Sequence, residues 1–137
     1  MDRTDPRLTK VFKRYPGILA VYLFGSSATG FTHQESDLDL AVVPVNNQVR
    51  NQKLNILTDL ARMGFDNIDL VFLDTDDIVL KYEAVKHNLL IYQTENFNRG
   101  EMYSKVVRQY LDFKPYLKVQ REAYKRRLIH GQPRSHS

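Results

Sequence analysis

The chain has 137 residues, of which 42% are hydrophobic, and it contains no cysteine. This length is typical of one domain, and the hydrophobic content is too high for a disordered chain. The lack of cysteine excludes disulfides, thiolate metal sites and a cysteine nucleophile. The longest apolar run, residues 18–24, is much shorter than the roughly 20 residues of a membrane helix. We therefore expect one cytoplasmic domain over residues 1–130, with no membrane contact, and a disordered tail at residues 131–137.

The net charge of +4 is unevenly distributed along the chain. From Lys114 onward there are seven Lys and Arg residues and a single acid, Glu122, so this segment carries +6 and residues 1–113 carry −2. A basic segment suggests an anionic partner, such as a nucleotide phosphate, RNA or an acidic protein surface. A solvated helix end that aids solubility explains the same charges equally well.

The first third of the chain predicts a helix and two strands. Asp5 and Pro6 indicate a helix start, because Asp is a good N-cap and Pro fits the first helical position. The continuous apolar run at residues 18–24 predicts a strand that is buried on both faces. Residues 25–36 are small and polar and predict a loop with a short helix, and residues 37–43 predict a second strand.

The remaining chain alternates between helical and extended patterns. Residues 47–63 have apolar residues at helical spacing, and Gly64 follows in the C-cap position. An apolar stretch at residues 68–73 predicts a third strand. The later elements are a helix at residues 76–86, a short strand at residues 89–92, and a helical segment at residues 95–128 that Pro115 should kink or divide. This order predicts an α/β fold with a small sheet flanked by helices and a long C-terminal helical segment.

Three aspartates interrupt the predicted strands. Asp37 and Asp39 are two positions apart, so they point to the same face of their strand while Leu38 faces the core. Paired acids on a strand repel each other, which a fold accepts more readily when a cation lies between them. Asp69 lies in the next strand and can join the pair if the two strands are neighbours. Three acids on one face suit two Mg²⁺ ions about 3.5–4 Å apart, as in phosphoryl transfer.

A glycine-containing loop lies between the first strand and this acidic pair. Gly25 follows the strand directly and allows a tight turn. Free N–H groups of Ser26, Ser27 and the following short helix can cradle a triphosphate, and the Ser26 hydroxyl can donate to a phosphate oxygen. Ser36 either orients the loop or simply precedes the second strand.

The combined pattern is more specific than either part alone. Gly25-Ser26, ten further residues and then Asp37-Leu38-Asp39, with Asp69 in a later strand, resembles the DNA polymerase β-like nucleotidyltransferase superfamily. The short chain is most similar to its minimal nucleotidyltransferase (MNT) branch, which commonly acts as antitoxins of HEPN-domain ribonuclease toxins. The resemblance implies a polymerase β palm-like fold with a small mixed sheet. Motifs support it over residues 18–72, and length and element order over nearly the whole chain.

The resemblance also implies roles for individual residues. Gly25 and Ser26 would hold the β- and γ-phosphates of ATP, Asp37 and Asp39 would bind both Mg²⁺ ions, and Asp69 would bind the catalytic ion and activate the acceptor hydroxyl. One departure concerns Ser27 and Thr29, because many family members carry Arg at these places. A Lys or Arg from elsewhere in the chain, or from a partner, would have to neutralise the triphosphate instead.

The resemblance further implies a reaction and a partner. The expected function is Mg²⁺-dependent transfer of AMP from ATP to a hydroxyl, most simply a tyrosine, of a HEPN-type toxin in a heteromeric complex. The first alternative is an antitoxin that neutralises the toxin by stoichiometric binding without catalysis, which the missing Arg residues favour. The second is an enzyme that acts on a small-molecule hydroxyl, of aminoglycoside type, which the short chain argues against.

Structural explanations remain open for several of these residues. Asp37 and Asp39 could be polar positions on an edge strand, and Asp69 could be a turn residue or helix cap. Asp74, Asp76 and Asp77 are typical of the N-cap and first turn of the next helix. The C-terminal segment also carries a stripe of large apolar side chains that either packs on the domain or forms a partner-binding face. Its members are Tyr103, Tyr110, Phe113, Tyr116, Leu117 and Tyr124.

Overall fold

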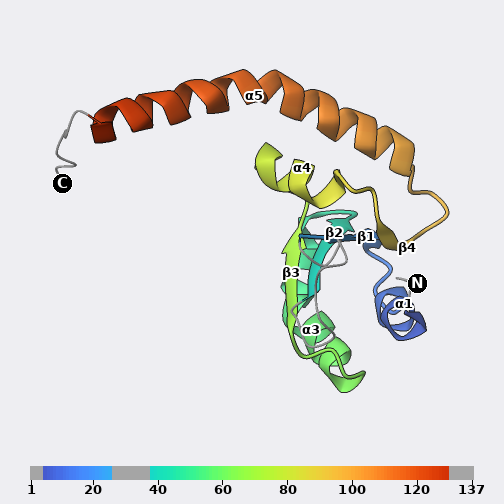
Figure 1. Cartoon of the computed structure of the whole chain (residues 1–137). Helices are drawn as coiled ribbons and strands as arrows, with labels where there is room; N and C mark the ends of the chain where they lie inside the picture. Colours follow the sequence, from blue (N-terminus) through green and yellow to red (C-terminus); the bar gives the residue numbers. More distant parts are fainter. Residues whose placement is uncertain (1–4, 26–37, 130–137) are drawn as a thin grey trace.

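The computed structural model describes residues 5–25 and 38–129, which form a four-stranded sheet with helices on both faces (Figure 1). The elements in chain order are α1 (Pro6–Lys13), β1 (Ile18–Phe24), β2 (Leu38–Pro44), the 3₁₀ helix η1 (Asn47–Gln52), α3 (Lys53–Arg62), β3 (Ile68–Phe72), α4 (Ile78–Val85), β4 (Leu90–Gln93) and α5 (Arg99–Ile129). The predicted tail at residues 131–137 lies outside the described residues.

The sheet has the strand order β3-β2-β1-β4 and is mixed. β1 pairs antiparallel with β2 and with β4, whereas β2 and β3 run parallel. β1 is central and covered on both faces, so six of its seven residues are buried, as its unbroken apolar sequence predicts. The small mixed sheet flanked by helices confirms the predicted α/β fold.

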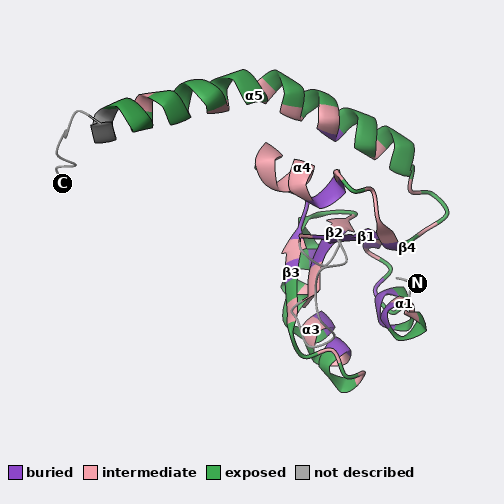
Figure 2. Ribbon diagram, in the orientation of Figure 1, coloured by how far each residue is buried: buried purple, intermediate pink, exposed green. Residues whose placement is uncertain are grey.

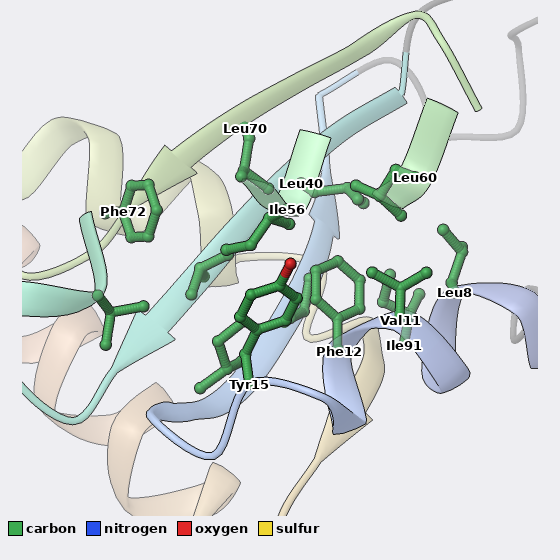
Figure 3. Packing of buried hydrophobic residues seen from close by; sticks show 14 of the residues in the cluster. Leu8, Val11, Phe12, Tyr15, Leu40, Ile56, Leu60, Leu70, Phe72 and Ile91 are labelled. Carbon is green, nitrogen blue, oxygen red and sulfur yellow. The ribbon is translucent and has the colours of Figure 1, made fainter. Parts of the chain in front are cut away.

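Helices α1 and α3 cover one face of the sheet. Asp5 caps α1 by accepting a 2.9 Å hydrogen bond from the backbone N–H of Arg7, and Pro6 occupies the first turn. Figure 3 shows Phe12 of α1 packed beside Leu40 of β2 and Ile56 of α3 in the larger buried cluster. The hydroxyl of Tyr15 donates a 2.5 Å hydrogen bond to Asp59, which ties the end of α1 to α3.

Helices α4 and α5 cover the opposite face. Val106 of α5 and Val85 of α4 belong to a second buried cluster that includes Tyr22 of β1. The rings of Tyr82 and Tyr110 stack with centroids 3.9 Å apart, which fixes α5 along α4. Beyond this contact α5 continues past the start of α4, and Figure 2 shows that most of this continuation is exposed.

Several element boundaries differ from the sequence-based expectation. The helix predicted at residues 47–63 begins as the 3₁₀ helix η1, because the side chain of Asn46 caps it at Gln48 before α3 starts. Pro115 does not divide the C-terminal segment but lies inside the single helix α5. A proline removes one backbone hydrogen bond, and the helical turns on either side hold the helix together. α5 begins at Arg99, four residues later than predicted.

Other local predictions are confirmed. Gly64 follows the end of α3 with φ +100°, a conformation that favours glycine, and the backbone N–H of Gly64 donates to Ala61. The short strand predicted at residues 89–92 is β4. No helix within residues 5–25 and 38–129 combines the length and apolar character needed to span a bilayer.

The buried cluster between α1, α3 and the sheet should dominate stability. Phe12 is fully buried and its ring lies 6.1 Å from that of Tyr92, so Phe12→Ala should lower the free energy of unfolding by about 3–5 kcal/mol. Leu54 is 75% exposed on α3, and Leu54→Ala should change it by less than about 0.5 kcal/mol. Urea unfolding followed by circular dichroism measures both; similar losses in the two variants would contradict this packing.

Candidate active site

Two aspartates face each other across neighbouring parallel strands. Asp39 of β2 is the register partner of Asp69 of β3, and the pairing continues with Leu40 opposite Leu70. Register partners in adjacent strands point to the same face, and their backbones are about 4.8 Å apart. Asp39 is half-buried and Asp69 is exposed. The two carboxyl groups are therefore neighbours on one accessible face, where their charges repel.

The face on which they lie is the one covered further along by α4 and α5. Side chains alternate along a strand, so Asp39 shares a face with Ala41, and Asp69 shares it with Val71. Ala41 belongs to the cluster formed with α4 and α5, and Val71 packs against it. The carboxylates thus occupy the part of this face next to the start of β2 and β3, beside the cluster that α4 and α5 cover.

Gly25 brings the end of β1 against the same carboxylate. Phe24 is the register partner of Asp39, and the next residue, Gly25, turns with φ +66°. A Cβ atom at Gly25 would lie 2.3 Å from Oδ2 of Asp39 and 3.1 Å from its Cγ. Only glycine allows this approach without a shift of Asp39, so the backbone at the point where the chain leaves β1 lies in contact with the carboxylate.

The remaining predicted site residues cannot be located in the same way. Asp37, Ser26, Ser27 and Ser36 all lie outside the described residues. Within the described ranges, no group of three or more His, Cys, Asp or Glu side chains is arranged to hold a metal ion. The described part of the site is therefore the pair Asp39 and Asp69 together with Gly25, and the roles of all seven predicted residues stay predictions.

Two of the three acids after β3 have structural roles, although these differ in part from those predicted. Asp77 caps α4 by accepting a 3.1 Å hydrogen bond from the backbone N–H of Leu80, as predicted. Asp74 does not belong to the first turn of α4 but forms a 2.7 Å ion pair with Arg50. Asp76 also precedes the helix, which begins at Ile78. The partners of Asp74 and Asp77 therefore lie outside the carboxylate pair.

Two features of the site region were not anticipated from the sequence. The contact between Gly25 and Asp39 depends on the antiparallel register of β1 and β2, although a glycine at the end of a buried strand hints at such an approach. Tyr22 is fully buried on the face that Phe24 and Asp39 share, and burial raises the pKa of its hydroxyl to about 12. Tyr22 therefore stays protonated at neutral pH and is no candidate for a general base.

Solved structures with the same fold come from toxin–antitoxin systems. One is a toxin–antitoxin with AMP-PNP, at 23% identity and a TM-score of 0.68, covering 90% of this chain and 96% of that one. Another is a tri-AMPylated Shewanella oneidensis HEPN toxin in complex with MNT antitoxin, at 21% identity and a TM-score of 0.61, covering 90% and 96%. The toxin–antitoxin MntA-HepT matches at 22% identity and a TM-score of 0.58, covering 90% and 97%. At identities of 21–23%, these matches establish the fold of this chain and nothing beyond it.

The sequence itself identifies the family. No curated protein matches the chain. The family described as "Polymerase beta, Nucleotidyltransferase" matches residues 7–97, which include all four strands, Gly25 and the carboxylate pair. This match covers more than half of the chain and agrees with the small mixed sheet. The chain therefore belongs to the polymerase beta nucleotidyltransferase family.

Proposed function

We propose that the protein is an antitoxin that transfers AMP from ATP to a hydroxyl group of a partner HEPN-type toxin, using Asp37, Asp39 and Asp69. The observation that carries the proposal is the register pairing of Asp39 with Asp69 beside the Gly25 turn. Two acids side by side on a strand face repel each other, a cost that a fold accepts more readily when a cation lies between them. Their value lies in holding a cation and the anionic substrate that accompanies it.

The residues present fit magnesium as the cation. Asp39 and Asp69 offer carboxylate oxygens from adjacent strands, and Asp37 precedes Asp39 by two residues. Mg²⁺ prefers oxygen ligands and keeps positions for water and phosphate oxygens, so a site with few carboxylates suits it. When bound, magnesium supplies the positive charge that stabilises the phosphate oxygens during transfer.

The protein side chains have distinct tasks in the proposed transfer. The N–H groups and hydroxyl of the Gly25-Ser26-Ser27 segment bind the β- and γ-phosphates, and Ser36 orients the end of that loop. Asp69 accepts the proton of the acceptor hydroxyl, because it is the more exposed of the described pair. The hydroxyl oxygen then forms a bond to the α-phosphorus while the bond to the β-phosphate oxygen breaks, and pyrophosphate leaves.

Two of the similar solved structures support the nucleotide and the acceptor. One contains AMP-PNP, an ATP analogue, and another contains a HEPN toxin that carries three AMP groups. Both cover at least 90% of this chain, so a comparable size suffices in those complexes for work on a protein acceptor. We propose a tyrosine hydroxyl of the toxin as the acceptor, where added phosphate charge would repel RNA.

The direct test is a transfer assay with the HEPN-type protein encoded beside this chain. Incubation of both proteins with ATP and Mg²⁺ should increase the mass of the toxin by one or more AMP units, as measured by intact-protein mass spectrometry. Removal of Mg²⁺ by EDTA should abolish the increase. An unmodified toxin after prolonged incubation with active, nucleotide-binding protein would refute the proposal.

The role of Asp69 can be isolated with a nearby control. Asp69→Asn should slow AMP transfer by about 100-fold or more, because it removes both a metal ligand and the proton acceptor. Asp66 is an equally exposed acid in the loop before β3, and Asp66→Asn should leave the rate within about twofold. Equal losses of rate in the two variants would show that only the local negative charge matters.

The pair of Asp39 and Asp69 predicts an effect of divalent metal on the stability of the protein. Without divalent cations, Asp69→Asn should raise the free energy of unfolding by about 0.2–1 kcal/mol, because it removes like-charge repulsion with Asp39. Mg²⁺ with ATP should raise the melting temperature of the wild type but not of the variant. Calorimetry in EDTA and in Mg²⁺ buffers measures both effects. A variant that is less stable than the wild type in EDTA would argue that Asp69 has a structural role.

Gly25 provides a test that is independent of charge. Gly25→Ala should lower the free energy of unfolding by about 1–2 kcal/mol because of the left-handed backbone alone. The loss should be larger still, because the new Cβ meets Asp39. The substitution should also weaken Mg²⁺–ATP binding through displacement of that carboxylate. Gly100 lies in the first turn of α5 with its nearest neighbouring atom at 3.6 Å, and Gly100→Ala should stabilise the protein by up to about 1 kcal/mol. Loss of ATP binding in both variants would contradict the proposed link.

A second candidate is an antitoxin that acts by binding alone. Ser27 and Thr29 occupy places where Arg would help to neutralise the triphosphate, and this favours weak or absent catalysis. The two functions differ in the behaviour of Asp39→Asn. If that variant neutralises the toxin fully without any gain in toxin mass, binding alone explains the antitoxin activity.

A further inference from the structure

The stripe of α5 that packs on the domain continues beyond it. Val106 is buried against the sheet, and Tyr110 stacks on Tyr82 of α4. Residues three or four apart share a helix face, so Phe113 and Leu117 extend the same side of α5. Gln120 and Tyr124 follow at the same spacing, and Tyr124 is 44% exposed. Figure 1 shows this part of α5 running beyond the start of α4.

A row of basic side chains runs beside this apolar stripe. Each is shifted by one position from a stripe residue, so the row lies along one edge of the stripe. Its members are all exposed: Lys114, Lys118, Arg121 and Lys125. Lys114 and Lys118, and likewise Arg121 and Lys125, are four residues apart, where like charges repel by about 0.2–0.5 kcal/mol per pair. The projecting half of α5 therefore has an apolar centre and a basic edge, along which Glu122 is the single acid and lies one turn from Lys118.

A groove marks the place where α5 leaves the domain. It has a volume of about 420 Å³ and lies between the start of α4 and α5, with Ile78, Phe113 and Tyr116 among its lining residues. Tyr116 is 67% exposed at its rim. Asp76 and Asp112 also line the groove, against the single cation Lys81. The groove extends the apolar stripe but is not basic itself.

We propose that the projecting half of α5 and the adjoining groove form the docking surface for the toxin, through a toxin surface with an apolar centre and an acidic rim. This inference rests on the proposed antitoxin function. A helix of about 13 residues beyond the domain is marginally stable on its own, and less so with four cations on one edge. An acidic partner surface would neutralise that edge and cover Phe113 and Leu117.

The charges and the apolar stripe argue against two other occupants. A second copy of this chain would bring two basic edges together, which is unfavourable without intervening anions. RNA would fit the basic row, but its phosphate backbone would leave the apolar side chains of Phe113 and Leu117 without a packing partner. An acidic protein surface neutralises the basic row, and apolar side chains of the same partner can pack against the apolar stripe.

The position of α5 also relates the docking surface to the carboxylate pair. α4 and α5 cover the face of the sheet to which Asp39 and Asp69 point. A toxin held on α5 therefore lies on the carboxylate side of the sheet rather than behind it. The docking surface would raise the local concentration of the acceptor hydroxyl near the site without belonging to the site.

The experiment compares two double charge reversals on different faces of α5. Lys118→Glu with Arg121→Glu alters the proposed edge, whereas Arg108→Glu with Arg126→Glu makes the same charge change on another exposed face. Isothermal titration of the toxin encoded beside this chain should show at least about tenfold weaker binding for the first pair and at most about twofold for the second. Leu117→Asp should also weaken binding about tenfold or more. Mg²⁺–ATP affinity should stay at the wild-type value in all three variants.

The outcomes separate this inference from the proposed function. If the toxin binds, the Lys118→Glu and Arg121→Glu pair weakens binding, and no AMP is transferred, the docking surface is upheld and the catalytic proposal is refuted. If AMP is transferred but both double variants bind the toxin equally well, the docking surface alone is refuted. It is also refuted if the wild type does not bind the toxin. If this chain self-associates and Leu117→Asp abolishes the self-association, the occupant of the surface is a second copy. If a labelled RNA oligonucleotide binds tightly and Lys118→Glu with Arg121→Glu weakens that binding, the occupant is RNA. Either result overturns the proposal.

Discussion

Repulsion between Asp39 and Asp69 is the constraint on which the site depends. The pair is fixed because β2 and β3 run parallel with Asp39 opposite Asp69, and because the next pairs in register are apolar. Leu40 and Leu70 are buried together on the opposite face, in the cluster with α1 and α3. A slip by one residue would turn these leucines outward and the aspartates into the core, at a cost far larger than the repulsion. Hydrophobic packing on one face therefore holds two like charges together on the other.

The same register explains why the turn after β1 and the carboxylates meet. β1 and β2 are antiparallel, so the last residue of β1, Phe24, lies opposite one of the first residues of β2, Asp39. The chain leaves the sheet at Gly25 and returns beside the carboxylate it has just contacted. The segment that follows Gly25 is thus joined to β1 at one end and to β2 at the other, and the register of these strands sets where the chain leaves the sheet relative to Asp39.

Much of this arrangement is visible in the sequence because it is local. The unbroken apolar run of β1, the alternation around Asp39, and the caps at Asp5, Asp77 and Gly64 depend on near neighbours only. The pairing of Asp39 with Asp69 is not local, because it requires that β3 align with β2 after a helical crossover. Family resemblance suggested it, but composition and periodicity could not supply the register.

Two expectations differ from the structure for different reasons. Pro115 was expected to kink or divide the last helix, and it does not divide it, because a lost hydrogen bond does not end a helix with well-formed turns on both sides. Asp74 was expected at the N-cap or in the first turn of α4, but it precedes the helix and pairs with Arg50, 24 residues earlier in the chain. Only the second outcome depends on a residue that is distant in sequence.

The length of α5 separates its basic edge from the turns that pack on the domain. Val106 and Tyr110 fix the first half of α5 on the domain, and the helix then leads away from it. Lys118 lies eight residues beyond Tyr110, which is about 12 Å further along the helix axis. The basic edge is thus carried away from the turns of α5 that pack on the domain, where an external partner of opposite charge can reach it.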